Sequence, residues 1–156
     1  MLRSIIVGLV LATVTIVIHA VGTYGWVARL RRSPNPSASP DRLLASARVL
    51  CATAIYLLFL HIVEVTVWAV AYLLVVGGQS LTTFEQSIYF STVTFAALGY
   101  GDVVIEGPWR LLSAIQAMMG LLVFGWSSAL LFAVVQRILH ANDMSFASEE
   151  GDSRID

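Results

Sequence analysis

Gly99, Tyr100, Gly101 and Asp102 form a short segment between two long apolar runs of the sequence. Irregular backbone at membrane depth is tolerated only where it is buried in protein or lines a water-filled path. Glycine at positions 99 and 101 permits left-handed backbone. In this setting the segment predicts backbone carbonyl oxygens turned toward an axis, where they replace the water shell of an ion.

Residues 89–102 read Y-F-S-T-V-T-F-A-A-L-G-Y-G-D. They resemble the pore helix and selectivity filter of the potassium channel superfamily, most of whose members read T-V-G-Y-G-D or T-L-G-Y-G-D here. The resemblance covers about residues 43–139 and is to bacterial channels of the two-transmembrane-pore type, here with an extra N-terminal helix. It implies a homotetramer that mediates passive potassium transport, with potassium held by the backbone carbonyls of Leu98, Gly99 and Tyr100. The expected ion-binding filter is Ala97, Leu98, Gly99, Tyr100, Gly101 and Asp102.

The residues before the filter are expected to support it. Thr82-Thr83-Phe84-Glu85 fits a capping box with Thr82 as the cap and Glu85 reaching back, which predicts a pore helix over 83–95. The partially negative C-terminal end of that helix favours a cation at the filter. Tyr100 is expected to point away from the axis into a cuff of aromatic side chains. The expected support residues are Glu85, Tyr89, Phe90, Thr92, Val93 and Thr94.

The sequence departs from the family pattern at the start of the filter and within the pore helix. Ala97 stands where the family usually has Thr, and Ala96 where it often has Thr; Ala97 lacks the hydroxyl that lines the innermost ion site. One net hydrogen bond contributes about 0.5–1.5 kcal/mol, so we expect potassium selectivity with a weakened innermost site and altered barium block or conductance. Val93 stands where some relatives carry a Glu that pairs with the filter Asp. Asp102 is therefore expected to bond elsewhere behind the filter or to face the outer mouth.

The composition is that of a membrane protein. Of 156 residues, 58% are hydrophobic and only 12% are charged, against about 25% charged in soluble domains. A spanning helix needs about 20 apolar residues, and three segments meet this: 1–28, 43–76 and 109–139. These predict an all-α integral membrane protein with three transmembrane helices and a re-entrant pore helix and filter. Residues 29–42 are expected to form a Pro/Ser linker, and residues 140–156 a disordered acidic tail.

The placement of arginine predicts the orientation in the cell membrane. Five arginines cluster between the first span and the start of the second: Arg29, Arg31, Arg32, Arg42 and Arg48. Only Arg3 and Arg110 fall on the opposite side. The positive-inside rule puts the cluster, the linker and the C-terminal tail in the cytoplasm and the N-terminus outside. The first span is too long for the apolar part of a signal peptide and is expected to be retained as an accessory helix.

Gly120 and Gly125 match in position the two glycines of the family's inner helix. They are interpreted either as gating hinges or as small residues that allow close helix packing. The ion-lining face of this helix is expected to hold Gly120, Val123, Phe124, Ser127 and Leu131.

His61 and Glu64 lie three residues apart on one face of the second span. Ionisable groups inside a membrane are functional candidates. Three interpretations stay open: a hydrogen-bonded structural pair, a proton sensor, or ligands of a metal shared with a partner chain. His19 in the first span is most simply a packing residue, although it could meet His61 or Glu64.

Other classes of function find little support in the sequence. The net charge of −1 gives no basis for a nucleic-acid partner, and a lone Cys51 excludes an intrachain disulfide framework. No plausible Ser-His-Asp or Cys-His arrangement suggests an enzyme, and no cofactor is expected beyond potassium as the transported ion. The expected partners are membrane lipid and further copies of the chain. Two alternatives remain: a poorly selective cation channel, and a non-conducting assembly or sensory subunit with a pore-like fold.

Overall fold

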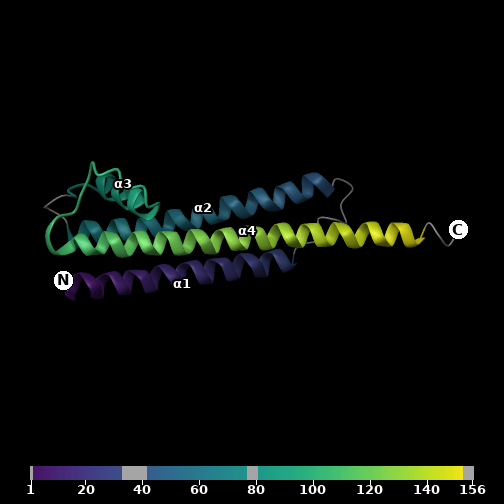
Figure 1. Ribbon diagram of the computed structural model, residues 1–156, viewed down its shortest axis with the longest axis horizontal. Helices are drawn as coiled ribbons and strands as arrows, with labels where there is room; N and C mark the ends of the chain where they lie inside the picture. Colours follow the sequence, from purple (N-terminus) through teal and green to yellow (C-terminus); the bar gives the residue numbers. More distant parts are fainter. Residues whose placement is uncertain (1, 33–41, 77–80, 153–156) are drawn as a thin grey trace. The chain divides into compact units, whose positions relative to one another are not determined.

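The computed structural model describes residues 2–32, 42–76 and 81–152. It contains four α-helices, which are α1 (Leu2–Arg32), α2 (Arg42–Val75), α3 (Phe84–Phe95) and α4 (Arg110–Asp152), and the short 3-10 helix η2 (Gly107–Trp109) (Figure 1). No strand occurs within these described ranges. Three helices are long and apolar enough to cross a membrane: Leu2–Arg32, Leu43–Val75 and Gly107–His140. The predicted all-α membrane fold is therefore confirmed.

Two of the long helices extend beyond their predicted ends. α1 continues to Arg32 rather than stopping at residue 28, because proline first appears at position 34. The prediction of a disordered tail is wrong for residues 141–152, since α4 continues to Asp152. This stretch contains no proline, its only glycine is next to the helix end, and each residue added to an existing helix costs little. Most of the predicted linker, residues 33–41, lies outside the described residues.

The chain forms two compact units, each of which contains parts of the three long helices. The first unit combines Met1–Gly22 with Leu58–Trp126 and holds α3 and residues 97–102, the predicted filter, which is called the filter below. The second unit combines Thr23–Leu57 with Ser127–Asp156.

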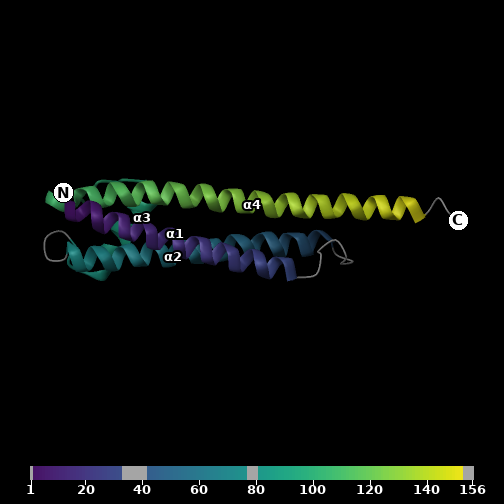
Figure 2. The same cartoon turned by 90° about the horizontal axis from the view of Figure 1, so that it is seen from below.

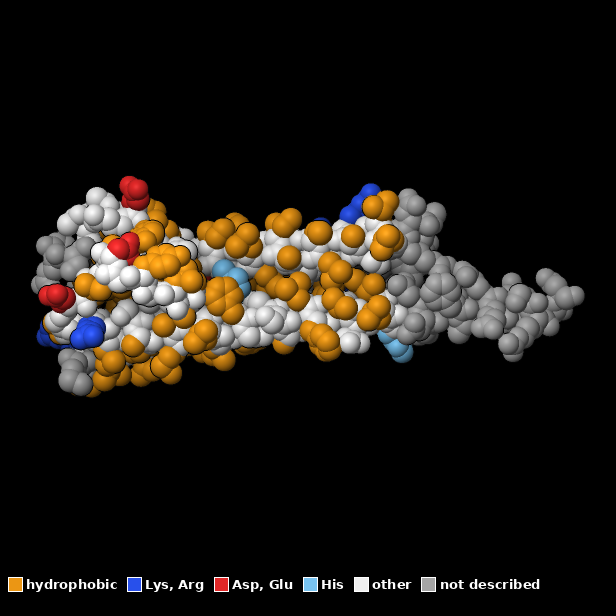
Figure 3. Space-filling view, turned by 45° about the horizontal axis from the view of Figure 1, so that its top comes forward, with side chains coloured by type: hydrophobic (Ala, Val, Ile, Leu, Met, Phe, Trp, Pro, Cys, Tyr) orange, Lys and Arg blue, Asp and Glu red, His pale blue; other side chains and the backbone are white. Residues whose placement is uncertain are grey.

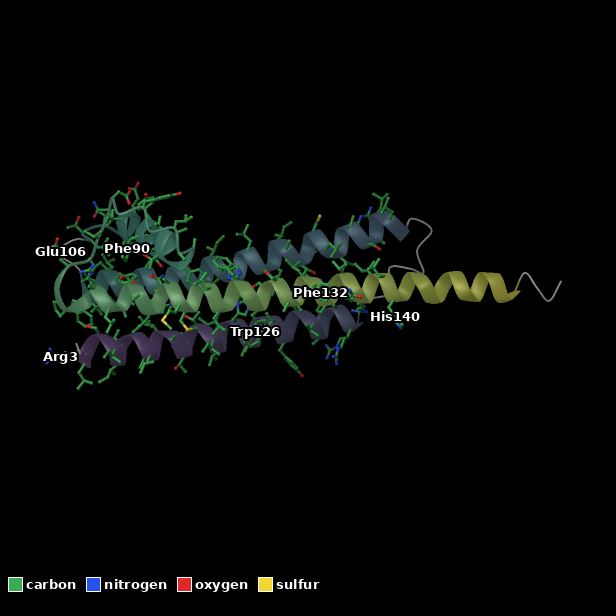
Figure 4. All side chains as sticks on the ribbon, viewed as in Figure 1. Arg3, Phe90, Glu106, Trp126, Phe132 and His140 are labelled. Carbon is green, nitrogen blue, oxygen red and sulfur yellow. The ribbon has the colours of Figure 1, made fainter. Side chains whose placement is uncertain are left out.

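The core of the first unit is built around two aromatic side chains of α2, Trp68 and Tyr72, neither of which has exposed area. Phe90 lies on α3 (Figure 4). Its ring packs edge-on against that of Tyr72, with the ring centres 5.1 Å apart. The buried apolar cluster draws on all four helices and the segment before η2, and it comprises Ala12, Trp68, Tyr72, Val76, Leu81, Phe90, Ile105, Leu112 and Met119. This core fixes α3 against α2 and α4.

Within the first unit, α1 runs from α4 to α2. Near its start Ser4 Oγ donates to the carbonyl of Pro108, just before α4. Gly8 lies so close to Ile115 of α4 that a Cβ there would press on its side chain. Further along, Trp68 Nε1 donates to Thr15 Oγ1 at 2.9 Å. Figure 2 shows α1 starting beside α4 and crossing toward α2.

The second unit is held by its own aromatic and polar contacts. Trp26 stacks on Tyr56 with the ring centres 4.5 Å apart, and Trp26 Nε1 donates to Thr53 Oγ1 at 3.1 Å. Arg137 donates to the carbonyl of Leu30 at 3.0 Å. That bond satisfies one of the carbonyls that the last turn of α1 leaves without a helical partner.

Large apolar side chains remain exposed along the helices, as the orange atoms in Figure 3 show. Leu74 is 78% exposed, Met118 is 71% and Phe132 is 64%. Contiguous apolar surface of this kind marks contact with a membrane or with another protein chain.

Candidate functional site: the segment after α3

The start of α3 differs by one residue from the prediction. Its cap is Thr83, whose Oγ1 accepts a hydrogen bond from the backbone N–H of Gln86 at 3.2 Å. The side chain of Gln86 reaches back and accepts from the backbone N–H and the hydroxyl of Thr82, each at 3.0 Å. The predicted pairing of Thr82 with Glu85 is therefore wrong, because the adjacent Thr and Gln offer the same groups one residue later. Glu85 is exposed in the first turn, where its charge favours the positive end of the helix.

The end of α3 passes directly into the filter through a Schellman motif. The backbone N–H of Ala97 donates to the carbonyl of Thr94 at 2.9 Å, and that of Leu98 donates to the carbonyl of Val93 at 3.0 Å. Ala97 takes the left-handed position of the motif, with φ 55°. A left-handed L-residue costs about 1–2 kcal/mol, and side-chain branching at Cβ makes the conformation rarer still. A small residue at position 97 therefore has a backbone reason.

Left-handed backbone recurs at every second residue of the filter. Gly99 has φ 57° and Gly101 has φ 80°, which follow Ala97 at φ 55°. A Cβ built on either glycine meets nothing within 4 Å. Glycine is thus required at these positions by the backbone conformation rather than by lack of space, as the sequence predicts.

The far end of the filter is tied back to α3. The hydroxyl of Tyr89 donates to Asp102 Oδ2 at 2.6 Å. This bond holds the pKa of the Asp102 carboxyl below its usual range, and it raises the pKa of the Tyr89 hydroxyl. Asp102 therefore has a hydrogen-bond partner within the chain, and both side chains of this bond are exposed.

Two side chains of the filter are exposed in the single chain. Leu98 is 55% exposed and Tyr100 is 66% exposed. Among the described residues no aromatic ring pairs with Tyr100, so one chain alone does not form the expected cuff. Phe90 is buried in the core, whereas Thr92 is exposed with its hydroxyl donating to the carbonyl of Ile88. A cavity of 680 Å³ lies against the filter, between α3 and the first half of α4.

Comparison with known protein families decides the broad identity. A family model described as an ion channel matches residues 48–137, which is more than half of the chain. The chain belongs to this ion channel family. The family has a pore module of two membrane helices and includes potassium channels, which fits the resemblance noted in the sequence. Comparison with curated proteins and with solved structures gave no match.

The matched region of the channel includes most of α2, all of α3 and the filter, and α4 as far as Arg137, whereas α1 lies wholly before it. The family match therefore covers the pore module of two membrane helices. It does not cover the accessory helix α1, whose place is argued from its own contacts.

A buried polar network of the channel joins α2, α3 and α4 and was missed by the sequence reasoning. Gln116 Nε2 donates to Ser91 Oγ at 2.7 Å and to the carbonyl of Ser91 at 3.2 Å. The hydroxyl of Tyr72 donates to Gln116 Oε1 at 2.8 Å, and Ser91 Oγ donates to the carbonyl of Val65 at 2.8 Å. A glutamine inside an apolar span was the available signal, because buried polar groups in membranes seek partners.

The two glycines of α4 have different surroundings. Gly120 is buried, and a Cβ there would collide with the carbonyl of Phe95 at the end of α3, which supports the packing interpretation. A Cβ at Gly125 would meet nothing within 4 Å, so packing within the chain gives no reason for glycine there.

The predicted ion-lining face of α4 is wrong at several positions. Val123 is fully buried and packs with Phe95 and Val65, and Ser127 is only 6% exposed. The helix is apolar all round, so the sequence pattern could not fix which face points inward. Leu121, Leu122 and Gly125 are exposed instead.

His61 and Glu64 meet His19 in the first unit. His61 Nδ1 lies 3.1 Å from Glu64 Oε2, and His19 Nδ1 lies 2.9 Å from Glu64 Oε1. The side chains of His19 and Glu64 have no exposed area, and that of His61 is 11% exposed. The structure thus joins α1 to α2 through one carboxylate held between two imidazoles.

Proposed function

We propose that the protein is a potassium-selective channel that mediates passive potassium transport through a homotetrameric pore. The supporting observation is the left-handed backbone at Ala97, Gly99 and Gly101. Alternation of left- and right-handed residues places successive N–H groups on one side of the chain and carbonyls on the other. This pattern supports the proposal that the carbonyls of the G-Y-G-D segment coordinate an ion.

In this proposal, the carbonyls of Leu98, Gly99 and Tyr100 from four chains replace the waters of a potassium ion. α3 directs its partially negative end to the start of the filter and favours a cation there. The exposed side chain of Tyr100 and the apolar surface of the helices provide faces for the neighbouring chains and for lipid. Potassium is the transported ligand, and its sites are formed by the backbone.

Glycine substitutions test the filter. Gly99→Ala and Gly101→Ala place a side chain on left-handed backbone and should abolish potassium flux from liposomes. Gly107→Ala is the matched control, because Gly107 also has positive φ, 71°, but lies outside the filter. We expect it to retain flux. Wild-type flux that survives both filter substitutions would contradict the proposal.

The absence of a hydroxyl at Ala97 supports one rival, a poorly selective cation channel. The same flux assay separates the two, because the rival predicts equal release of potassium and sodium. A non-conducting subunit predicts that neither ion is released.

We further propose the orientation of the channel in the cell membrane, with the N-terminus and the filter outside and the C-terminus in the cytoplasm. The bond from Ser4 to Pro108 places Arg3 and Arg110 near the same end of the first unit, and Arg29, Arg31 and Arg32 lie at the opposite end of α1. In a Cys51→Ser background, a membrane-impermeant thiol reagent should label Arg3→Cys and not Arg31→Cys in intact cells. The reverse pattern would overturn the orientation.

A further inference from the structure

The described residues contain one group of histidine, cysteine, aspartate and glutamate side chains that could share an ion. Its members are His19 on α1 with His61 and Glu64 on α2, and their ligand atoms all lie within 4.8 Å of one another. Hydrogen bonding accounts for the cluster in its present form. However, two imidazole nitrogens and a carboxylate that lie this close together are also groups that bind metal ions.

Two imidazoles and one carboxylate are a three-ligand set used for zinc, with water in the fourth position. His19 Nδ1 lies 2.9 Å from Glu64 Oε1, His61 Nδ1 lies 3.1 Å from Glu64 Oε2, and one ligand atom from each residue lies within 4.8 Å of the others. Neighbouring ligand atoms on a tetrahedral zinc ion with bonds of about 2.0–2.1 Å stand roughly 3.3 Å apart. A small outward movement of the three side chains would therefore admit an ion.

The surroundings favour a compact site. The two imidazole rings are stacked with their centres 5.6 Å apart. Trp126 of α4, which is labelled in Figure 4, packs edge-on against the His19 ring, with the ring centres 5.3 Å apart. The ring centres of Phe124 and His61 lie 4.7 Å apart. These aromatic side chains limit the orientations of both imidazoles, which lowers the cost of arranging the ligands.

We propose that His19, His61 and Glu64 form a binding site for one divalent transition-metal ion of the zinc type. Imidazole nitrogen suits zinc, copper and nickel, whereas calcium and magnesium prefer oxygen ligands. The ion takes the place of the hydrogen bonds to Glu64, and each imidazole presents the Nδ1 lone pair and carries its proton on Nε2. Bound metal connects the accessory helix α1 to α2.

The site also contacts the end of α3 and the middle of α4. His61 lies 6.0 Å, centre to centre, from Phe95, the last residue of α3, and Phe124 of α4 touches both rings. When His61 shifts toward a bound metal, its contacts with Phe95 of α3 and Phe124 of α4 change as well. The metal site itself stands on the geometry of the cluster and is independent of potassium selectivity.

Metal binding by the purified full-length protein tests the proposal without any measurement of ion flux. After removal of metal with a chelator, the protein is dialysed against zinc chloride and its zinc content is measured. We expect one zinc ion per chain for the wild type. His19→Gln and His61→Gln should each bind at least tenfold more weakly, since even the loss of groups that only support metal ligands costs 10–100-fold.

Three controls make the result specific. His140→Gln removes the third histidine of the chain and Cys51→Ser removes the only thiol, and both should bind as the wild type does. His61→Cys supplies another zinc ligand and should restore binding that His61→Gln loses. A wild type that binds no zinc, or variants at positions 19 and 61 that bind like the wild type, would overturn the proposal. Either result would leave the channel function intact, because flux is measured separately.

Discussion

Ala97 has two roles at the residue scale. It is the left-handed residue of the Schellman motif at the end of α3, and it begins the proposed filter at the position where the potassium channel superfamily usually has Thr. The sequence could show that the hydroxyl is missing. It could not show the backbone conformation, which gives a reason for a small side chain at this position.

The conformation of Ala97 predicts the order of stability among its variants. Ala97→Gly should stabilise the protein by about 1 kcal/mol, because glycine has no left-handed penalty. Ala97→Thr should destabilise it, because a β-branched residue at φ 55° is strained. Thermal unfolding in detergent measures both changes. Equal stability of the Gly, Ala and Thr proteins would contradict the left-handed assignment.

Ala97→Ser is the better test of the missing hydroxyl, because it adds that group without branching at Cβ. We expect it to change barium block or conductance by strengthening the innermost ion site. Single-channel recording compares it with the wild type. If block and conductance are the same in both, the idea of a weakened site fails.

The bond between Tyr89 and Asp102 predicts a response to acid. The lowered pKa of Asp102 means that its stabilising contribution is complete above the ordinary pKa of about 3.9 and is lost as pH falls through the lowered value. Tyr89→Phe removes the donor, so the pKa of Asp102 rises and the acid loss shifts to higher pH. Potassium current recorded against external pH measures the shift. Tyr24→Phe, at a tyrosine that is 78% exposed, is the control, and an unshifted acid limb in Tyr89→Phe would exclude the bond as the cause.

At the scale of elements, the type and order of the helices could be predicted because long apolar runs and a short capped segment are strong local signals. The helix cap, the buried face of α4 and the polar network depend on contacts between residues that are far apart in the sequence or compete locally. The cap of α3 moved from Thr82 to Thr83 because Gln86 competes with Glu85. The inward face of α4 needed the contact with α3, and the Gln116 network needed partners from two other helices.

The two glycines of α4 give a prediction at the same scale. Gly120→Ala should destabilise the protein by about 1–3 kcal/mol, because its Cβ overpacks against the carbonyl of Phe95. Gly125→Ala meets open space and should not lower stability, since alanine favours a helix more than glycine does. Thermal unfolding compares the two variants. A larger loss in Gly125→Ala than in Gly120→Ala would contradict the packing of α4 on α3.

At the scale of the whole molecule, the chain combines a pore module with an accessory helix. The ion channel family accounts for residues 48–137, and α1 lies before them. α1 reaches the pore module through Ser4, Thr15 and His19. Polar bonds buried in a membrane protein are made between specific partners, so this helix is attached in a defined register. The sequence indicated such contacts only through isolated polar residues in the first span.

The most direct test of the central claim is the reversal potential of the purified protein in a planar bilayer under opposed potassium and sodium gradients. We predict a value near the potassium equilibrium potential, because the proposed filter has left-handed backbone at Ala97, Gly99 and Gly101, as carbonyl coordination of the ion would require. A robust current that reverses near zero would contradict potassium selectivity and would identify a poorly selective cation channel instead.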